Sequence, residues 1–154
     1  MRILAVSDSH GYDYLLRDIF KRENAAADVI AHCGDGAPSM LNMGEYTFGK
    51  PVYTCRGNCD SSAYGLENVT LFEVGGKRVL LTHGHLYQAK LTLENLTYAA
   101  LEKEAQIVLF GHTHEARYEY YKNVWLINPG CAAENEYAVI DINGDKIIPT
   151  LKRL

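Results

Sequence analysis

The amino-acid sequence predicts an α/β protein in which two mixed β-sheets pack face to face with helices outside. Three observations support this prediction. Short β-branched runs alternate with helical stretches, the first third follows the order strand, helix, strand, strand, and the second half is rich in hairpin turns. A strand–helix–strand unit joins parallel strands through a crossover, whereas hairpins join antiparallel strands. Because no Pro/Ser/Gly-rich linker divides the 154 residues, we expect one domain over residues 1–154.

Strands are expected wherever a short apolar run rich in β-branched residues is bounded by turn residues. In chain order these runs are residues 2–7, 28–33, 51–56, 69–74, 78–82, 107–110, 116–121, 124–127, 137–143 and 146–152. Two tight turns separate neighbouring runs, at Gly75-Gly76 and at Asn143-Gly144-Asp145. Both contain glycine, which supplies the positive φ that hairpin turns require.

Two longer stretches show the periodicity of an amphipathic helix. Residues 12–22 carry their apolar stripe at spacings i, i+1, i+4 and i+5, through Leu15, Leu16, Ile19 and Phe20. Residues 87–103 form the second expected helix, with core-facing positions at Leu91, Leu93, Leu96, Ala99 and Ala100. A short irregular helix is expected within residues 39–49.

The composition is typical of a soluble globular protein. Hydrophobic residues make up 47% and charged residues 22% of the chain, which excludes disorder and low complexity. No run approaches the roughly 18 apolar residues of a membrane span, and the N-terminus lacks a signal-peptide layout. We therefore expect a cytoplasmic protein with no membrane partner. The net charge of −4 argues against a general electrostatic affinity for nucleic acid.

The four cysteines are expected to be free thiols. Their spacing is irregular, and no Cys-x-x-Cys pair suggests a zinc knuckle or a thioredoxin-like motif. Cys33, Cys55 and Cys131 are interpreted as small buried side chains that fill the core.

Short polar clusters follow five of the expected strands, at residues 7–11, 34–36, 57–60, 82–85 and 111–114. They contain every histidine except His32. In α/β sheets, ligands bind in the crevice beyond the carboxyl ends of the strands. We therefore expect these clusters to bring carboxylates, an amide and several imidazoles together.

Such a set of side chains predicts a metal site. Carboxylate oxygens mixed with imidazole suit Mn²⁺, Fe²⁺ or Zn²⁺, and the lack of grouped thiolates argues against a closed zinc site. The candidate ligands are too many for one ion, whereas seven ligands fit two ions when one carboxylate bridges them. The alternative is a scatter of structural polar residues, because alternate strand residues share a face for ordinary packing reasons.

The clusters also carry a resemblance to a known family. The motifs Asp8-x-His10, Gly34-Asp35, Gly57-Asn58, His83-Gly84 and Gly111-His112-x-His114 resemble, in order and form, those of the calcineurin-like metallophosphoesterase superfamily. The short chain, without a cap domain, is most similar to the small single-domain prokaryotic phosphodiesterases. Asn128-Pro129-Gly130 resembles the Asn-Pro-Gly-Ser turn of that branch, with Cys131 in the serine position. The resemblance implies a four-layer αββα sandwich.

The resemblance also implies a ligand for each position. One ion would be held by Asp8, His10, Asp35 and His114. The second would be held by Asp35, Asn58, His83 and His112, so that Asp35 bridges the two. The implied cofactors are two divalent cations, Mn²⁺ first, with Fe²⁺, Zn²⁺ or Ni²⁺ as alternatives.

Other polar residues of the clusters are expected around the ligands. His85 would orient a ligand by hydrogen bonding, and Asp60 is placed in the same outer group. Arg56 would either clamp a phosphate oxygen or act as a structural arginine. His32 has two equally open interpretations, a buried core histidine with its hydrogen bonds satisfied or a residue of the site.

Cys59 is where this chain departs from the wider superfamily. Many members place a histidine there, which contacts the phosphate and is thought to protonate the leaving group. Cys59 is therefore expected to contact the phosphate, but a thiol of pKa about 8.5 is a poor proton donor. The identity of a general acid stays open.

The expected function is that of a metal-dependent phosphodiesterase. A hydroxide held between the two ions would attack phosphorus in line with the departing oxygen. Asp35 and Asn58 are the expected catalytic residues. The expected substrate is a small phosphodiester or phosphomonoester, and both a monomer and a homodimer fit. One rival is a non-catalytic protein-binding scaffold, as in the small retromer subunit, which the complete ligand set disfavours. A nuclease is a second rival, which the acidic balance disfavours.

Overall fold

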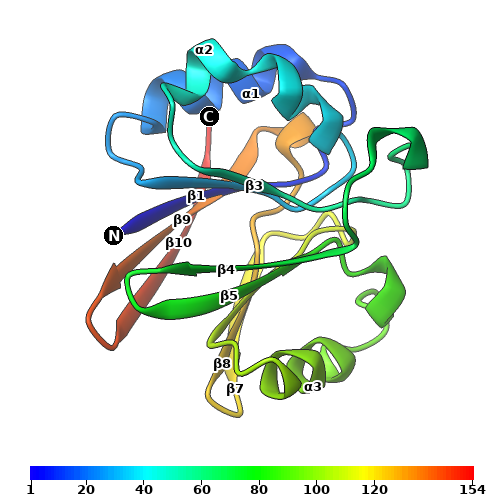
Figure 1. The fold of residues 1–154 in the computed structure, drawn as a ribbon, viewed down its shortest axis with the longest axis vertical. Helices are drawn as coiled ribbons and strands as arrows, with labels where there is room; N and C mark the ends of the chain where they lie inside the picture. The colour runs from blue at the N-terminus through cyan, green and yellow to red at the C-terminus, as the bar shows by residue number, and fades with distance from the viewer.

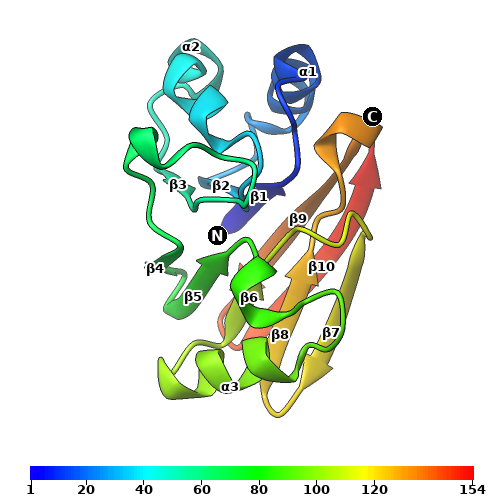
Figure 2. The same ribbon diagram turned by 90° about the vertical axis from the view of Figure 1, so that its right-hand side faces the viewer.

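Two five-stranded β-sheets lie face to face in the computed structural model, which describes residues 1–154. The first sheet has the strand order β10(Lys146–Arg153), β9(Glu136–Asn143), β1(Arg2–Val6), β2(Val29–His32) and β3(Val52–Thr54). The second has the order β4(Val69–Val74), β5(Lys77–Thr82), β6(Ile107–Leu109), β8(Val124–Asn128) and β7(Arg117–Tyr121). Helices cover the outer faces of both sheets (Figures 1 and 2), so the predicted αββα sandwich is confirmed.

Both sheets are mixed, as predicted. In the first sheet β1, β2 and β3 are parallel, and β9 runs antiparallel beside β1. In the second sheet β5, β6 and β8 are parallel, while β4 and β7 are antiparallel edge strands joined to their neighbours by hairpins. Parallel strands end at the same edge of a sheet, so the loops that follow β1, β2 and β3, and those that follow β5 and β6, are grouped by the topology.

The core shows the two-residue period of a β-strand. Along β1, Ile3 and Ala5 point into the core between the sheets, whereas Leu4 and Val6 pack toward the helices. In β5 the same alternation sends Leu81 inward and Leu80 outward. The central strands of each sheet are therefore buried on both faces, which fits the continuous apolar runs in the sequence.

The helices lie where the apolar stripes predict them, with one correction. Helix α1(Asp13–Glu23) buries Leu16, Ile19 and Phe20 on the outer face of the first sheet. The predicted irregular helix within residues 39–49 is a 3₁₀ turn, Ala37–Asn42, followed by α2(Gly44–Thr47). Helix α3(Glu94–Glu102) covers the second sheet.

The helix predicted over residues 87–103 begins only at Glu94. A 3₁₀ turn at His85–Tyr87 precedes it, and Gln88 adopts a left-handed φ of 55°, which ends any helical path. Leu91 was predicted to face the core but is 82% exposed, whereas Leu96 and Ala100 are buried as expected.

The predicted free thiols and hairpin turns are confirmed. The structure has no disulfide: Cys33, Cys55 and Cys131 are buried free thiols, and Cys59 is an exposed one. The turns at Gly75-Gly76 and at residues 143–145 join antiparallel pairs. None of the helices has the length and apolar composition needed to cross a membrane.

Candidate metal centre

The five polar loops meet at one place in the structure. Backbone hydrogen bonds tie them together in pairs: Asp8 N–H donates to the Gly34 carbonyl, and Gly111 N–H donates to the His83 carbonyl, both at 3.0 Å. The Cys59 N–H donates to Asp35 Oδ1 at 2.7 Å, which joins the third loop to the second. The predicted convergence of the strand ends is thus observed.

Five of the seven predicted ligands have a left-handed backbone. The φ angles of Asp8, His10, Asp35, His112 and His114 lie between 46° and 68°. Non-glycine residues rarely adopt this region, and such strain gathers at functional sites, where the surrounding structure holds it in place.

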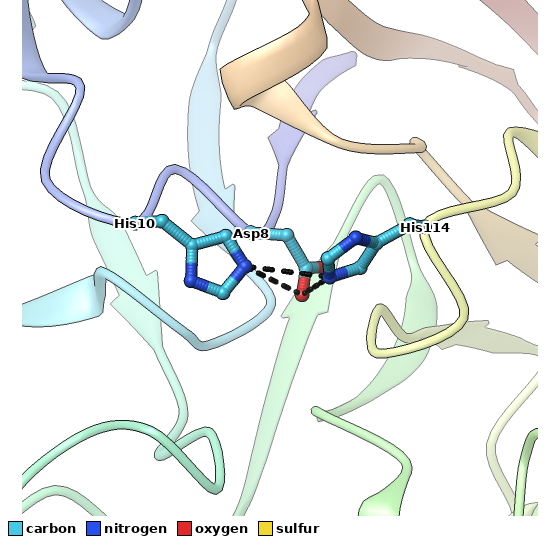
Figure 3. Close-up of side chains that lie close together, drawn as sticks. All are labelled: Asp8, His10 and His114. Carbon is cyan, nitrogen blue, oxygen red and sulfur yellow. Dashed lines mark hydrogen bonds and ion pairs between the residues drawn. The ribbon is translucent and has the colours of Figure 1, made fainter.

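Asp8 lies between two histidines that come from opposite ends of the motif set (Figure 3). Its Oδ1 is 3.1 Å from His114 Nε2 and 3.8 Å from His10 Nε2. The two Nε2 atoms are 3.3 Å apart. Carboxylate and imidazole ligand atoms from the loop after β1 and from the loop after β6 therefore point at the same volume.

The two oxygens of Asp8 have different surroundings. Oδ2 accepts hydrogen bonds from Ser7 Oγ and, at 3.1 Å, from His112 N–H. Oδ1 is buried and has no hydrogen-bond partner. A buried carboxylate oxygen without a partner is costly unless a cation or donor compensates it, so Oδ1 is poised to bind a ligand.

His83 and Asp35 form a second group beside the first. His83 Nε2 is 3.2 Å from Asp35 Oδ2 and 3.9 Å from Asp8 Oδ1. The other ring nitrogen, Nδ1, lies 2.7 Å from the Cys33 carbonyl oxygen, to which only an N–H can donate. This bond fixes the ring and directs Nε2, which is buried without a hydrogen-bond partner, into the centre.

Asp35 and His83 shift each other's pKa in the directions that favour their charged forms. Burial favours a higher pKa for Asp35, but the nearby His83 imidazole and the hydrogen bond from Cys59 N–H hold its pKa well below the usual range. Burial lowers the pKa of His83, but the nearby carboxylates of Asp35 and Asp8 raise it, and the net shift is upward. Asp35 is thus an anion at neutral pH, as a metal ligand must be.

The donor set fits divalent cations. Donor atoms of Asp8, His10 and His114 lie within 4.8 Å of one another, and so do those of Asp8, Asp35 and His83. Asp8 belongs to both groups, and Asp35 also lies within this distance of His10. Two of these potential ligand atoms, Asp8 Oδ1 and His83 Nε2, are buried without a hydrogen-bond partner, as expected of atoms that coordinate a cation.

The remaining two predicted ligands lie at the edge of these groups. The His112 ring is 5.1 Å from the His83 ring, centroid to centroid, and is half-buried. Asn58 is exposed, and its side-chain amide lies 3.5 Å from Cys59 Sγ. The metal-binding roles of both residues stay predictions.

Asp60 and Arg56 act as supports of the loop after β3. The buried Asp60 carboxylate accepts three backbone hydrogen bonds, from the N–H groups of Asp35, Gly36 and Gly57. Arg56 Nε donates to the Asp60 carbonyl at 3.1 Å, which favours a structural role over a phosphate clamp. This network fixes the bend that carries Asp35.

The two histidines outside the predicted ligand set have different environments. The His85 ring lies 5.4 Å from the His83 ring, and its buried Nδ1 has no partner. His32 is fully buried: its Nδ1 accepts from Gly34 N–H at 3.1 Å, and its Nε2 lies 3.0 Å from Ser9 Oγ. Burial lowers the pKa of His32 to about 4, so it is neutral and structural.

Sequence reasoning assigned no role to Asn128. Its fully buried amide donates to the Gly111 carbonyl at 3.0 Å and to Thr113 Oγ1 at 2.9 Å. Its Oδ1 accepts from Gly130 N–H at 2.9 Å. The Asn-Pro-Gly turn at the end of a strand was the available signal for this support of the His112–His114 loop.

Comparisons with known proteins agree with this geometry. The family model described as "Calcineurin-like phosphoesterase superfamily domain" matches residues 1–145. "Probable metallophosphoesterase YsnB" of Bacillus subtilis is 35% identical over 151 residues, which cover 94% of this chain and 86% of that protein. "Phosphodiesterase MJ0936" of Methanocaldococcus jannaschii is 27% identical over 146 residues, which cover 84% of this chain and 83% of that protein.

A solved structure from Streptococcus pneumoniae, described as a predicted phosphoesterase, superimposes with a TM-score of 0.83 at 25% identity. The match covers 99% of this chain and 88% of that one.

Proposed function

The chain belongs to the calcineurin-like phosphoesterase superfamily, and from this membership we propose that it is a phosphodiesterase with a dinuclear metal centre. The matched family and relative are named as phosphoesterase and metallophosphoesterase, and they support hydrolysis of a phosphoester with the help of metal ions. The proposed ligands are the seven residues predicted from the sequence, Asp8, His10, Asp35, Asn58, His83, His112 and His114.

One observation carries the proposal above the others. Asp8 Oδ1 is buried without a hydrogen-bond partner and lies within 3.9 Å of the Nε2 atoms of His10, His83 and His114. An anionic oxygen faced by three imidazole nitrogens is the donor arrangement that a divalent cation requires. Because the imidazoles come from both predicted halves of the centre, the arrangement supports two adjacent ions rather than one.

Divalent cations, when bound, lower the pKa of water and neutralise charge that develops on the phosphoryl oxygens. The residues of this chain supply the rest. Asp8 and Asp35 provide anionic oxygens whose orientation is fixed by hydrogen bonds to the Ser7, His112 and Cys59 loops. The Cys33 carbonyl holds the proton of His83 on Nδ1 and so leaves Nε2 free to act as a ligand.

A diester is favoured as substrate over a monoester. At neutral pH a phosphomonoester carries nearly one negative charge more than a diester, and sites for it are typically lined with arginine or lysine. No lysine or arginine lines the hollow beside His10, and Arg56 is engaged with the Asp60 carbonyl. The relative named "Phosphodiesterase MJ0936" supports the same choice.

Mn²⁺ is the proposed physiological metal, because the donor set is rich in imidazole and Mg²⁺ prefers oxygen ligands and retained waters. The test is to chelate the protein exhaustively, confirm metal loss by mass spectrometry, and assay bis(p-nitrophenyl) phosphate hydrolysis before and after adding single metals. We expect chelation to abolish hydrolysis and Mn²⁺ to restore it better than Mg²⁺. Full activity without detectable metal would overturn the proposal.

A further inference from the structure

A hollow of about 400 Å³ opens beside the candidate metal centre, on its His10 side. Its wall is built from the loops after β1, β2 and β3, and includes His10, Gly36, Pro38, Cys59, Ser61 and Tyr64. Three other hollows lie elsewhere on the molecule, and none of them is lined by a predicted ligand. Pockets of this size hold small organic ligands.

The wall of this hollow carries little net charge. It has no lysine or arginine, and its single carboxylate, Asp60, is already occupied by three backbone N–H groups. A second phosphate or another strongly anionic group would therefore find no counter-charge there. An uncharged group fits the wall better, because it needs no compensation when it leaves water.

Tyr64 gives the hollow a flat aromatic wall. Its side chain is 54% exposed and makes no ring–ring or cation contact within the protein. Tyr120 is a useful contrast: it is equally exposed, at 56%, but its ring packs 5.0 Å from the Trp125 ring. Gly36 and Pro38 line the same hollow as Tyr64, and the exposed Tyr64 ring, which has no ring partner within the protein, is suited to stack on a planar group.

We propose that this hollow binds the organic group of the ester, and that it selects a planar, uncharged group of nucleoside size. The inference rests on the proposed phosphodiesterase function, because the metal centre would hold the phosphate while the hollow holds its substituent. Tyr64 would stack on the ring, and the hydroxyl of Ser61, which lines the same hollow, would be available to its polar edge.

The first test compares two phosphomonoester products that share a phosphate and differ only in the organic group. Adenosine 5′-monophosphate and methyl phosphate are titrated by calorimetry into the Mn²⁺-loaded protein. We expect the nucleotide to bind at least about 10-fold more tightly, a preference of the size given by one base–aromatic stack. Tyr64→Ala should abolish the preference and Tyr64→Phe should keep it, while the matched control Tyr120→Ala should leave it unchanged.

The second test does not depend on activity. Cys59 is the one exposed thiol of the four cysteines, and it lines the hollow. Its alkylation by iodoacetamide, followed by intact-mass spectrometry, therefore reports whether the hollow is filled. The nucleotide should slow alkylation of the wild type several-fold at a concentration where methyl phosphate does not, and should not slow it in Tyr64→Ala.

The outcomes separate the two proposals. Equal affinities for both ligands, or a preference that survives in Tyr64→Ala, would overturn the subsite even if the protein hydrolyses diesters. A protein that binds the nucleotide through Tyr64 but hydrolyses no diester with any metal would overturn the proposed function and leave the subsite standing.

Discussion

Asn128 donates a hydrogen bond to Thr113 Oγ1 at 2.9 Å, from a strand of the second sheet to the loop between two candidate metal ligands. The same amide also donates to the Gly111 carbonyl, and the side chain is completely buried. One amide therefore contacts the residues on either side of His112, in the loop that also carries His114. The bend of that loop, with φ of 68° at His112 and 56° at His114, depends on such external support.

Asn128→Ala is expected to weaken metal binding although Asn128 does not touch the metal. Removing the amide frees the loop and leaves the Gly111 carbonyl without this donor. The expected loss in Mn²⁺ affinity is about 10–100-fold, as for other residues that orient ligands, with a fall in the free energy of unfolding of about 1–3 kcal/mol.

Calorimetric Mn²⁺ titration and denaturant unfolding measure the two effects of Asn128→Ala separately. Asn95→Ala is the matched control, because it removes an exposed amide that donates to the Tyr87 carbonyl away from the centre. If both variants bound Mn²⁺ as the wild type does, the positioning role of Asn128 would be wrong.

Asp35→Asn is expected to harm activity and metal content more than His85→Ala. The Asp35 carboxylate reaches both His10 and His83, and its charge is stabilised in place by Cys59 N–H. His85 makes no comparable contact, and its Nδ1 has no partner. Measuring kcat and bound metal for both variants decides between them. A larger loss of metal in His85→Ala would reverse the assignment of ligand and supporting residue.

His32 makes stability depend on pH between about 4 and 6.5. Burial lowers its pKa in the folded protein from 6.5 to about 4, so between these values the unfolded chain binds a proton that the folded chain does not. Stability is therefore fully present above about pH 6.5 and is lost progressively as the pH falls toward 4. The contribution of His32 to this loss is about 3 kcal/mol.

The measurement for His32 is the free energy of unfolding of the metal-free protein at several pH values between 4 and 7. His32→Asn keeps an acceptor near Gly34 N–H but cannot take up a proton. We expect a shallower pH dependence in the variant than in the wild type, although the variant is less stable at pH 7. Parallel curves for the two proteins would mean that His32 titrates normally in the fold.

The strands and the five site loops could be predicted because their signals are local. Apolar runs of β-branched residues end at Gly-Asp, Gly-Asn and His-x-His segments, and the bends at those segments are what the structure shows. The start of the second long helix could not be predicted. Leu91 and Leu93 continue the apolar spacing toward Leu96, and no proline or glycine marks the turn at Gln88.

The strand order and the supporting contacts could not be predicted from local sequence patterns. The C-terminal hairpin of β9 and β10 joins the first sheet beside β1, a pairing between residues more than 130 positions apart. Asn128, Ser9 and His32 likewise act through partners distant in sequence. Such contacts depend on tertiary packing, so the sequence motifs predicted which polar loops converge but not which side chains hold those loops in place.

Cys59 lies at the edge of the candidate metal centre. Its Sγ is exposed, lines the hollow beside the centre, and lies within 4.8 Å of donor atoms of His10 and Asp35. The hydrogen-bonded Asp35 carboxylate raises the pKa of the Cys59 thiol. Because the pKa of this thiol is raised and not lowered toward neutral pH, the thiol is poorly matched to the role of general acid.

Departure of the leaving group should therefore depend on the leaving group's own acidity. We expect kcat to fall steeply along a series of aryl phosphodiesters as leaving-group pKa rises, and alkyl esters to react far more slowly. Cys59→His should flatten this dependence and help poor leaving groups most, since a general acid contributes about 10²–10⁴-fold. Cys59→Ser is the control that changes the thiol without adding an imidazole, and its slope should match the wild type. The three proteins are assayed at equal metal content, because a change near Asn58 can disturb binding. A wild-type slope already near zero would show that another group donates the proton.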